Sequence, residues 1–135
     1  MATSKRTLRT VLLITGLLLL GLVAACAWLF YGHNIRERLS REPFDPAAWR
    51  SATTLADPAR IRMVDDLLRR HDLQGMTRDE VAALIGEPDE TNYFRDWDMV
   101  YWLGPERGFM SIDSEWLVLR LDEEMQITEV RIARD

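Results

Sequence analysis

An uncharged apolar run from Val11 to Tyr31 restricts what this chain can form more than any other feature. As a helix rising ~1.5 Å per residue, the run would extend about 31 Å, which matches the hydrocarbon thickness of a bilayer. Trp28 and Tyr31 lie at its end, where aromatic side chains favour the membrane–water boundary. Three basic residues and no acidic residue precede the run, which favours an inside position for the N-terminus. The run therefore predicts a membrane helix with the following domain outside the cytoplasm.

A second interpretation competes for the same segment. Val23-Ala24-Ala25-Cys26 resembles a lipobox, where a signal peptide is cut and the cysteine is lipidated. Cys26 is then the candidate lipidation site. The apolar run continues to Tyr31, however, whereas a mature lipoprotein usually begins with a polar linker. We therefore favour the uncut anchor and keep the lipoprotein as the alternative. Membrane lipid is the partner of the N-terminal segment in both cases.

Beyond Gly32 the chain is acidic. Of its 17 basic residues only three precede Gly32, which leaves 14 against 22 acidic residues and a formal net charge of −8. Nucleic-acid binding needs clustered basic charge, so we expect no nucleic-acid partner. Cys26 is the only cysteine, which excludes an intrachain disulfide. His33 and His71 are far apart in sequence, and zinc needs three or four ligands, so we expect no metal. The sequence has no phosphate-binding glycine loop, and we expect no cofactor.

Signals for both the start and the end of a short helix lie between Thr77 and Pro88. Thr77 can cap the first turn and Glu80, three residues on, can reach back to it, which is the spacing of a capping box. Gly86 suits the left-handed position after the last turn, where φ is positive, and Pro88 prevents the helix from continuing. The apolar stripe of this helix consists of Val81, Leu84 and Ile85.

The run Gly75 to Pro88, Gly-Met-Thr-Arg-Asp-Glu-Val-Ala-Ala-Leu-Ile-Gly-Glu-Pro, resembles the motif that opens the BamE-like (SmpA/OmlA) domains of small bacterial envelope lipoproteins. A similar unit occurs twice in the beta-lactamase inhibitor protein, which binds its target with an open sheet surface. The resemblance covers about Leu68 to Asp135. It implies a compact α/β sandwich facing the periplasm and an accessory role in envelope or outer-membrane assembly.

Two cap-and-proline pairs, Asp45-Pro46 and Asp57-Pro58, predict two helices before this motif. The first helix is short and carries Trp49, which we expect in the core. The second extends to His71, and two acid-before-base pairs four residues apart favour it. These pairs are Asp65 with Arg69 and Asp66 with Arg70. We divide the chain into an N-terminal anchor or signal (1–32), a charged linker with a short helix (33–57) and a BamE-like α/β domain (58–135).

Strand patterns follow Pro88. Three runs rich in β-forming residues, and a weaker fourth at Thr91 to Phe94, predict an antiparallel sheet. The three are Met99 to Leu103, Trp116 to Leu121 and Gln126 to Ile132. The predicted fold is α+β: an N-terminal membrane helix, then a two-layer sandwich of two helices packed on a three- to four-stranded antiparallel sheet.

The sheet face turned away from the helices is the candidate partner surface. If Leu117, Leu119 and Leu121 point inward, the residues that alternate with them point outward. A large aromatic beside arginines is typical of binding hot spots. The alternative is that the loop from Gly104 to Ser114 covers Trp116. The candidate face consists of Trp116, Val118, Arg120, Glu129 and Arg131.

No residue pattern identifies a reaction, so we expect no catalytic residues and no enzyme. Asp96 and Asp98 would need a pocket to act as a catalytic pair, and the serines lack a nucleophile elbow. We interpret the chain as a membrane-tethered, non-catalytic protein-interaction domain of the bacterial envelope. It would be a single-pass protein of the inner membrane, with its domain in the periplasm and an unidentified envelope protein as its partner. The alternative is an inhibitor or immunity-type binder acting through the open sheet face.

Overall fold

The computed structural model describes all residues except 1, 53–57 and 109–110, and it divides into two compact units, Met1–Arg38 and Leu39–Asp135. The first unit is formed by one helix, α1 (Ala2–Leu39). From Ser4 to Leu39 this helix is long and apolar enough to cross a membrane. Leu17 to Leu20 are each 57–69 % exposed, and a continuous apolar surface of this kind is disfavoured in water. A helix of spanning length is therefore confirmed at the predicted place.

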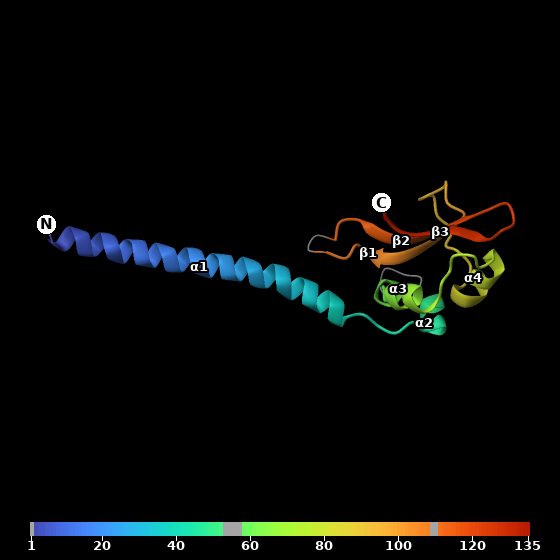
Figure 1. Ribbon diagram of the computed structural model, residues 1–135, viewed down its shortest axis with the longest axis horizontal. Coiled ribbons are helices and arrows are strands. Elements are labelled where there is room, and N and C mark those ends of the chain that lie inside the picture. The colour runs from blue at the N-terminus through green and yellow to red at the C-terminus, as the bar shows by residue number, and fades with distance from the viewer. Residues whose placement is uncertain (1, 53–57, 109–110) are drawn as a thin grey trace. The chain divides into compact units, whose positions relative to one another are not determined.

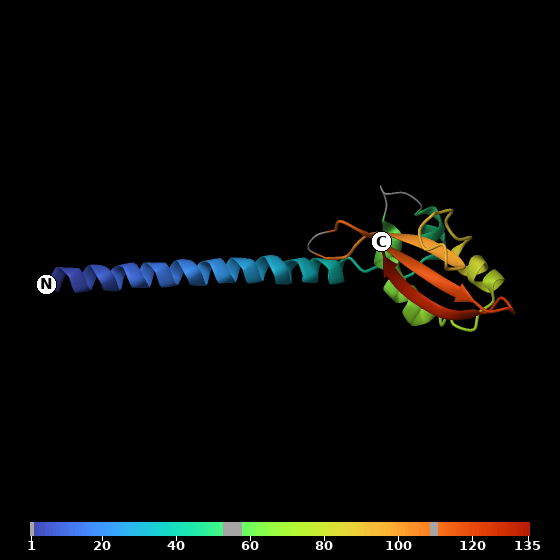
Figure 2. The same cartoon turned by 90° about the horizontal axis from the view of Figure 1, so that it is seen from above.

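The second unit places three helices before three strands (Figure 1). They are α2 (Pro46–Ser51), α3 (Ala59–Arg70), α4 (Arg78–Ile85), β1 (Met99–Pro105), β2 (Ser114–Leu121) and β3 (Ile127–Arg134). The strands form one open antiparallel sheet in the order β1-β2-β3, seen face-on in Figure 2. The α+β fold class is confirmed, with three strands.

The weaker strand expected at Thr91 to Phe94 does not form, and bends and turns occupy these residues. The Thr91 hydroxyl accepts a hydrogen bond from the backbone N–H of Tyr93 at 3.1 Å, which closes a local turn. Phe94 has a φ of 54°, which is incompatible with a strand. The prediction of a fourth strand was therefore wrong, because local turn hydrogen bonds replace a ladder there.

The main hydrophobic core combines side chains from all three helices of the second unit with one face of the sheet. Leu117 and Leu119 of β2 are fully buried in it, and Leu121 packs at its margin, so the predicted inward set is confirmed. Trp49 of α2 is also fully buried, as predicted. Asp45 caps α2 by accepting a hydrogen bond from the backbone N–H of Ala48 at 2.8 Å. This short helix, expected in a linker, thus contributes to the core.

The motif helix α4 has the predicted capping box. The hydroxyl of Thr77 accepts from the N–H of Glu80 at 3.3 Å, and the Glu80 carboxylate accepts from the N–H of Thr77 at 2.8 Å. The hydrogen bonds that the Glu80 carboxylate accepts from the backbone N–H and the hydroxyl of Thr77 lower its pKa. Gly86 ends the helix with a φ of 91° and a ψ of 174°, so φ is positive as predicted but the backbone is not left-handed helical.

The motif is also tied to the sheet at both ends. Before α4, the backbone of Gly75 and Met76 exchanges two 2.8 Å hydrogen bonds with Ile127 of β3. After α4, the carbonyl of Gly86 accepts from the hydroxyl of Tyr101 on β1 at 2.8 Å. Burial of Tyr101 raises the pKa of this phenol, so it stays a proton donor. The motif therefore fixes α4 against two different strands.

Thr77→Ala should lower the free energy of unfolding by about 1 kcal/mol, because the hydroxyl that caps the N-terminus of α4 is lost. Gly86→Val should cost more, because positive φ disfavours a branched side chain and a Cβ there would lie 3.3 Å from Cγ of Arg50. Denaturant melts of both variants check the order. A neutral Gly86→Val would mean that the helix does not end at this residue.

The helix α3 begins after Pro58, which makes no side-chain cap. Asp57, the predicted cap, lies outside the described residues. Met63, Val64 and Leu67 of α3 are buried in the core, while Ile61 and Leu68 are half-buried at its edge. The helix predicted between Pro58 and His71 is therefore confirmed.

Candidate functional site

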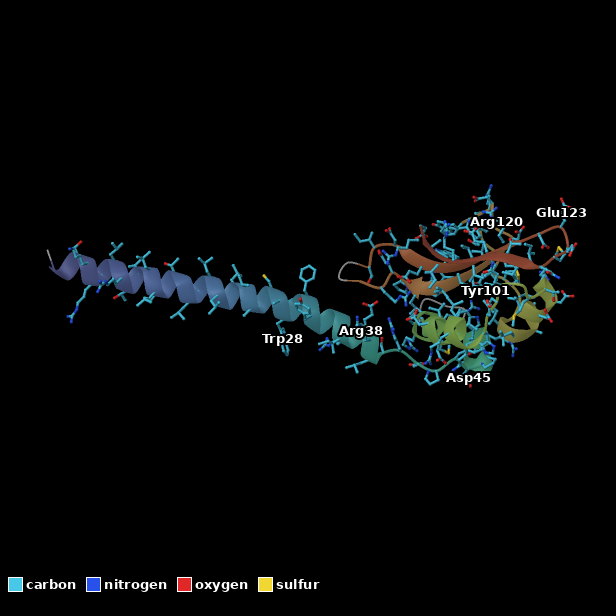
Figure 3. The ribbon with its side chains drawn as sticks, in the orientation of Figure 1. Trp28, Arg38, Asp45, Tyr101, Arg120 and Glu123 are labelled. Atoms are coloured by element: carbon cyan, nitrogen blue, oxygen red, sulfur yellow. The ribbon has the colours of Figure 1, made fainter. Side chains whose placement is uncertain are left out.

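The sheet face opposite the helices is built from side chains that lie side by side across the three strands. Figure 3 shows Arg120 on this side of the sheet and Tyr101 on the side toward α3. A register irregularity between Arg120 and Leu121 ends the regular pairing near the turn to β3. The cross-strand rows of this face are Trp102–Trp116–Ala133, Val100–Val118–Arg131 and Arg120–Glu129.

Two of the five predicted face residues are not exposed. Trp116 is 7 % exposed and Val118 is fully buried. Residues 89–98, which we call the cover segment, supply the contacts. The rings of Tyr93 and Phe94 lie 5.3 Å and 6.1 Å from the Trp116 ring, centroid to centroid. Trp116 and Val118 therefore lie on the outer face as predicted, but they are not open to a partner there, because the cover segment packs over them.

The alternative cover, the loop from Gly104 to Ser114, is not what buries Trp116 among the described residues. Ile112 in that loop is 80 % exposed. Phe109 and Met110, the other apolar residues expected there, lie outside the described residues. Among the described residues, the aromatic rings that cover Trp116 come from the chain before β1.

The cover segment is anchored at both ends by an aspartate. The Asp89 carboxylate accepts from the backbone N–H of Trp102 at 2.7 Å and from the guanidinium of Arg60 at 2.7 Å. Arg60 is only 3 % exposed and also donates to the carbonyl of Trp49 at 3.0 Å. At the other end, the Asp98 carboxylate accepts from the N–H of Leu121 at 2.7 Å. Asp98, considered from sequence as half of a carboxylate pair with Asp96, therefore holds the segment against β2.

The remaining three predicted residues stay at the surface and gather around Trp97. The guanidinium carbons of Arg120 and Arg131 lie 4.5 Å and 5.6 Å from the Trp97 ring centroid. The Glu129 carboxylate lies 3.5 Å from Arg120 and 2.9 Å from Arg131. We call Trp97, Arg120, Glu129 and Arg131 the Trp97 patch. It combines a half-buried aromatic with two arginines held in cation–π geometry.

Sequence reasoning missed Trp97 as a surface residue of this face. Its signal was present, since a tryptophan lies between two acidic residues in a segment without strand or helix periodicity. The backbone N–H of Trp97 donates to the carbonyl of Phe94 at 2.9 Å, which turns the ring back over the sheet. A tryptophan in a loop is thus brought beside residues from two strands.

A pocket of about 520 Å³ lies between the start of the cover segment and the sheet. We call it the aromatic pocket. Trp102 and Trp116, neighbours across β1 and β2, line it together with Tyr93. The indole N–H of Trp116 has no hydrogen-bond partner within the described part of the chain. The remaining lining residues are Asp89, Glu90, Thr91, Ser114 and Asp135.

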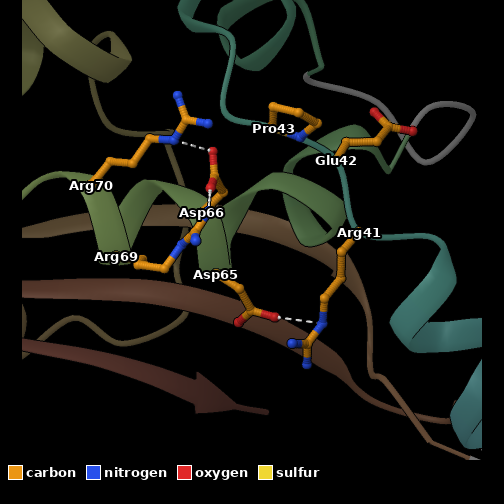
Figure 4. A pocket seen from close by; sticks show the side chains of 7 residues that line it. All are labelled: Arg41, Glu42, Pro43, Asp65, Asp66, Arg69 and Arg70. Carbon is orange, nitrogen blue, oxygen red and sulfur yellow. Dashed lines mark hydrogen bonds and ion pairs between the residues drawn. The ribbon is translucent and has the colours of Figure 1, made fainter.

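A second pocket, of about 460 Å³, lies beside α3 (Figure 4). Asp66 accepts from the N–H of Phe44 at 2.7 Å and pairs with Arg69 and, at 2.8 Å, with Arg70. The predicted Asp66–Arg70 pair is confirmed. The lining residues are Arg41, Glu42, Pro43, Asp65, Asp66, Arg69 and Arg70.

Asp65 does not make the predicted pair with Arg69. Its carboxylate instead lies 3.1 Å from Arg41 and 3.1 Å from Arg107, which arrives from the loop after β1. Arg107 in turn lies 2.7 Å from Glu115, whose side chain is 1 % exposed. Ion pairs to distant segments therefore replace the local Asp65–Arg69 pair. The charged side chains of this pocket are paired with one another or with neighbouring segments. We assign it a structural role.

The acid sensitivity of the fold should depend on Asp66. The hydrogen bond from the Phe44 backbone, followed by those from Arg69 and Arg70, lowers the pKa of its carboxyl group to about 2. Because the pKa of Asp66 is lower in the folded state than in the unfolded state, the ionised carboxylate stabilises the fold at any pH above the ordinary pKa of this group. This contribution is lost as the pH falls from about 4 toward 2. Asp66→Asn should flatten the stability profile in that window. Asp96→Asn should keep the wild-type profile, and chemical melts between pH 2 and 5 compare them.

Among the described residues, no group of three His, Cys, Asp or Glu side chains is arranged to hold a metal ion. The chain matches no family model, no curated protein and no solved structure. The BamE-like resemblance remains an interpretation of the motif residues Gly75 to Pro88.

Proposed function

We propose that this protein is a membrane-tethered, non-catalytic protein-interaction domain of the bacterial envelope and an accessory to envelope or outer-membrane assembly. The Trp97 patch is the observation that carries the proposal. Tryptophan and arginine are the residues most enriched in binding hot spots, and here the side chains of Arg120 and Arg131 are 43 % and 62 % exposed. The domain would be a two-layer α/β sandwich of the BamE-like kind, with its outer sheet face toward the partner.

The proposed tether is α1. Its 38 residues would extend about 57 Å, whereas the hydrocarbon core is about 30 Å thick. The helix would thus cross the inner membrane and continue as a stalk that carries Arg36 and Arg38 in its last turn. The basic N-terminus would stay in the cytoplasm and the domain would lie in the periplasm.

The mature protein should retain its N-terminal residues. The helix continues without a break past Cys26 to Leu39, which favours the uncut anchor. Mass spectrometry of the protein purified from membranes shows directly whether the N-terminal residues are still present. A diacylglycerol-modified Cys26 as the first residue would show instead that the protein is a lipoprotein, still tethered to a membrane.

The partner should be captured from solubilised membranes by the full-length wild-type chain and lost when the patch is changed. Arg120→Ala and Arg131→Ala should each weaken binding by about 1–3 kcal/mol and leave the melting temperature nearly unchanged. Arg78→Ala is the matched control, because Arg78 pairs with Glu87 beside α4 and lies outside the patch. It should bind like the wild type.

The captured protein distinguishes two functions. Components of the assembly machinery would support the accessory role. A single enzyme or toxin whose activity the chain suppresses would favour the inhibitor or immunity-type binder. Equal capture by Arg120→Ala, Arg131→Ala and the wild type would show that the partner site lies elsewhere.

A further inference from the structure

The aromatic pocket and the Trp97 patch lie on the same outer face but differ in charge. The patch presents Arg120 and Arg131, whereas three carboxylates and no basic side chain are found among the described residues that line the pocket. Asp89 is already paired with Arg60 at 2.7 Å, which neutralises it. Glu90 and Asp135 are exposed and leave the pocket locally negative.

The walls of the pocket suit an organic cation. Trp102 and Trp116 are direct neighbours in the register of β1 and β2, and the Tyr93 ring lies 5.3 Å from that of Trp116. Tyr93 is 54 % exposed, so part of this aromatic cluster is open to a ligand. The face of an aromatic ring attracts ammonium and guanidinium groups, and Trp is the strongest of the aromatic side chains in this respect.

A hard metal ion fits this lining poorly. Calcium takes six to eight oxygen ligands, whereas aromatic side chains form much of this surface. The Asp135 carboxylate also accepts a hydrogen bond from the N–H of Ser114 at 2.7 Å, which holds one of its oxygens. The lining therefore favours a cation that carries an apolar stem and a delocalised or bulky charged head.

We propose that the aromatic pocket receives an arginine side chain of the protein partner. This inference rests on the proposed function and specifies the partner's chemistry. The partner would present a basic side chain to the pocket and, beside it, an acidic group to the Trp97 patch. Such alternating charge fixes the orientation of a complex and excludes partners with the opposite pattern.

The test uses the full-length chain in detergent micelles with ¹⁵N-labelled tryptophan. The probe is the peptide acetyl-Gly-Gly-Arg-Gly-Gly-amide, and its control carries citrulline, a neutral isostere, in place of arginine. The arginine peptide should shift the indole signals of Trp102 and Trp116, and added salt should weaken this effect. Equal shifts with the citrulline peptide would overturn the proposal, because the charge would then play no part.

Three carboxylate variants locate the effect. Glu90→Gln and Asp135→Asn should each weaken peptide binding by about two- to fivefold, the range expected from an exposed ion pair. Both variants keep an acceptor oxygen and the side-chain size. Glu123→Gln, in the turn between β2 and β3 and labelled in Figure 3, should have no effect. An equal loss of peptide binding with Glu123→Gln would show that the peptide is attracted to the acidic domain as a whole, and it would overturn the proposal that the pocket is the binding site.

The same variants separate this inference from the proposed function. If capture of the partner needs Arg131 but is unchanged in the Glu90→Gln/Asp135→Asn double variant, the pocket assignment is wrong and the interaction domain stands. If the arginine peptide binds the pocket but no envelope protein is captured through this face, the proposed function fails while the pocket stands.

Discussion

Replacement of Trp116 by alanine should lower the free energy of unfolding by about 3–5 kcal/mol, the range seen when a large buried aromatic side chain is removed from a core. The side chain is 7 % exposed and lies on the outer face of the sheet, where the rings of Tyr93 and Phe94 pack against it. Its loss would leave a cavity under the cover segment. Denaturant melts of the full-length chain measure the change.

Two further variants define what the result means. Leu119→Ala, on the opposite side of β2, should also cost about 2–5 kcal/mol, because Leu119 is fully buried in the main core. Ile112→Ala, at an 80 % exposed position, should change stability by less than about 0.5 kcal/mol. A stable Trp116→Ala beside an unstable Leu119→Ala would show that the cover segment does not pack on the sheet.

Asp89→Ala should destabilise the domain by about 3 kcal/mol, at the lower end of the range for breaking a buried ion pair by removing one partner. Arg60 would remain buried at 3 % exposure without its carboxylate, and the N–H of Trp102 would lose its acceptor. The end of the cover segment would be released from the edge of β1. Outer-face binding should then weaken together with stability.

The neighbouring residue Glu90 provides the matched control. It is exposed, and Glu90→Ala should change the free energy of unfolding by less than about 0.5 kcal/mol. Asp89→Asn keeps one acceptor oxygen and should cost less than Asp89→Ala. Equal stability of the Asp89→Ala and Glu90→Ala variants would contradict the anchoring role of Asp89.

The candidate site in the structure consists partly of other residues than the sequence predicted. Period-2 alternation correctly divided β2 into two faces, with Leu117 and Leu119 on the helix side. It could not show that the other face is also partly buried. Arg120 and Arg131 remained on the surface as predicted, whereas Trp116 became a core residue of a second, smaller cluster. Trp97, which is half-buried, took its place as the aromatic beside the two arginines.

Local signals in the sequence determined where helices begin and end, because caps, proline and glycine act on backbone groups only a few residues away. The capping box of Thr77 and Glu80, the Asp45 cap and the positive φ of Gly86 are all of this kind. The sequence likewise determined the apolar length of α1 and the inward set of β2, since each depends on a periodicity within one segment.

Only the tertiary structure decided which segments meet. Asp89 reaches Arg60 across 29 residues, and Arg107 reaches Asp65 across 42. No local pattern encodes such pairings, because they depend on how the loops close around the finished sheet. Asp65 illustrates the consequence, since a favourable partner four residues away was available and a distant arginine was bound instead. The charge and exposure of the outer face are therefore properties of the assembled domain, set by the packing of the cover segment over the strands.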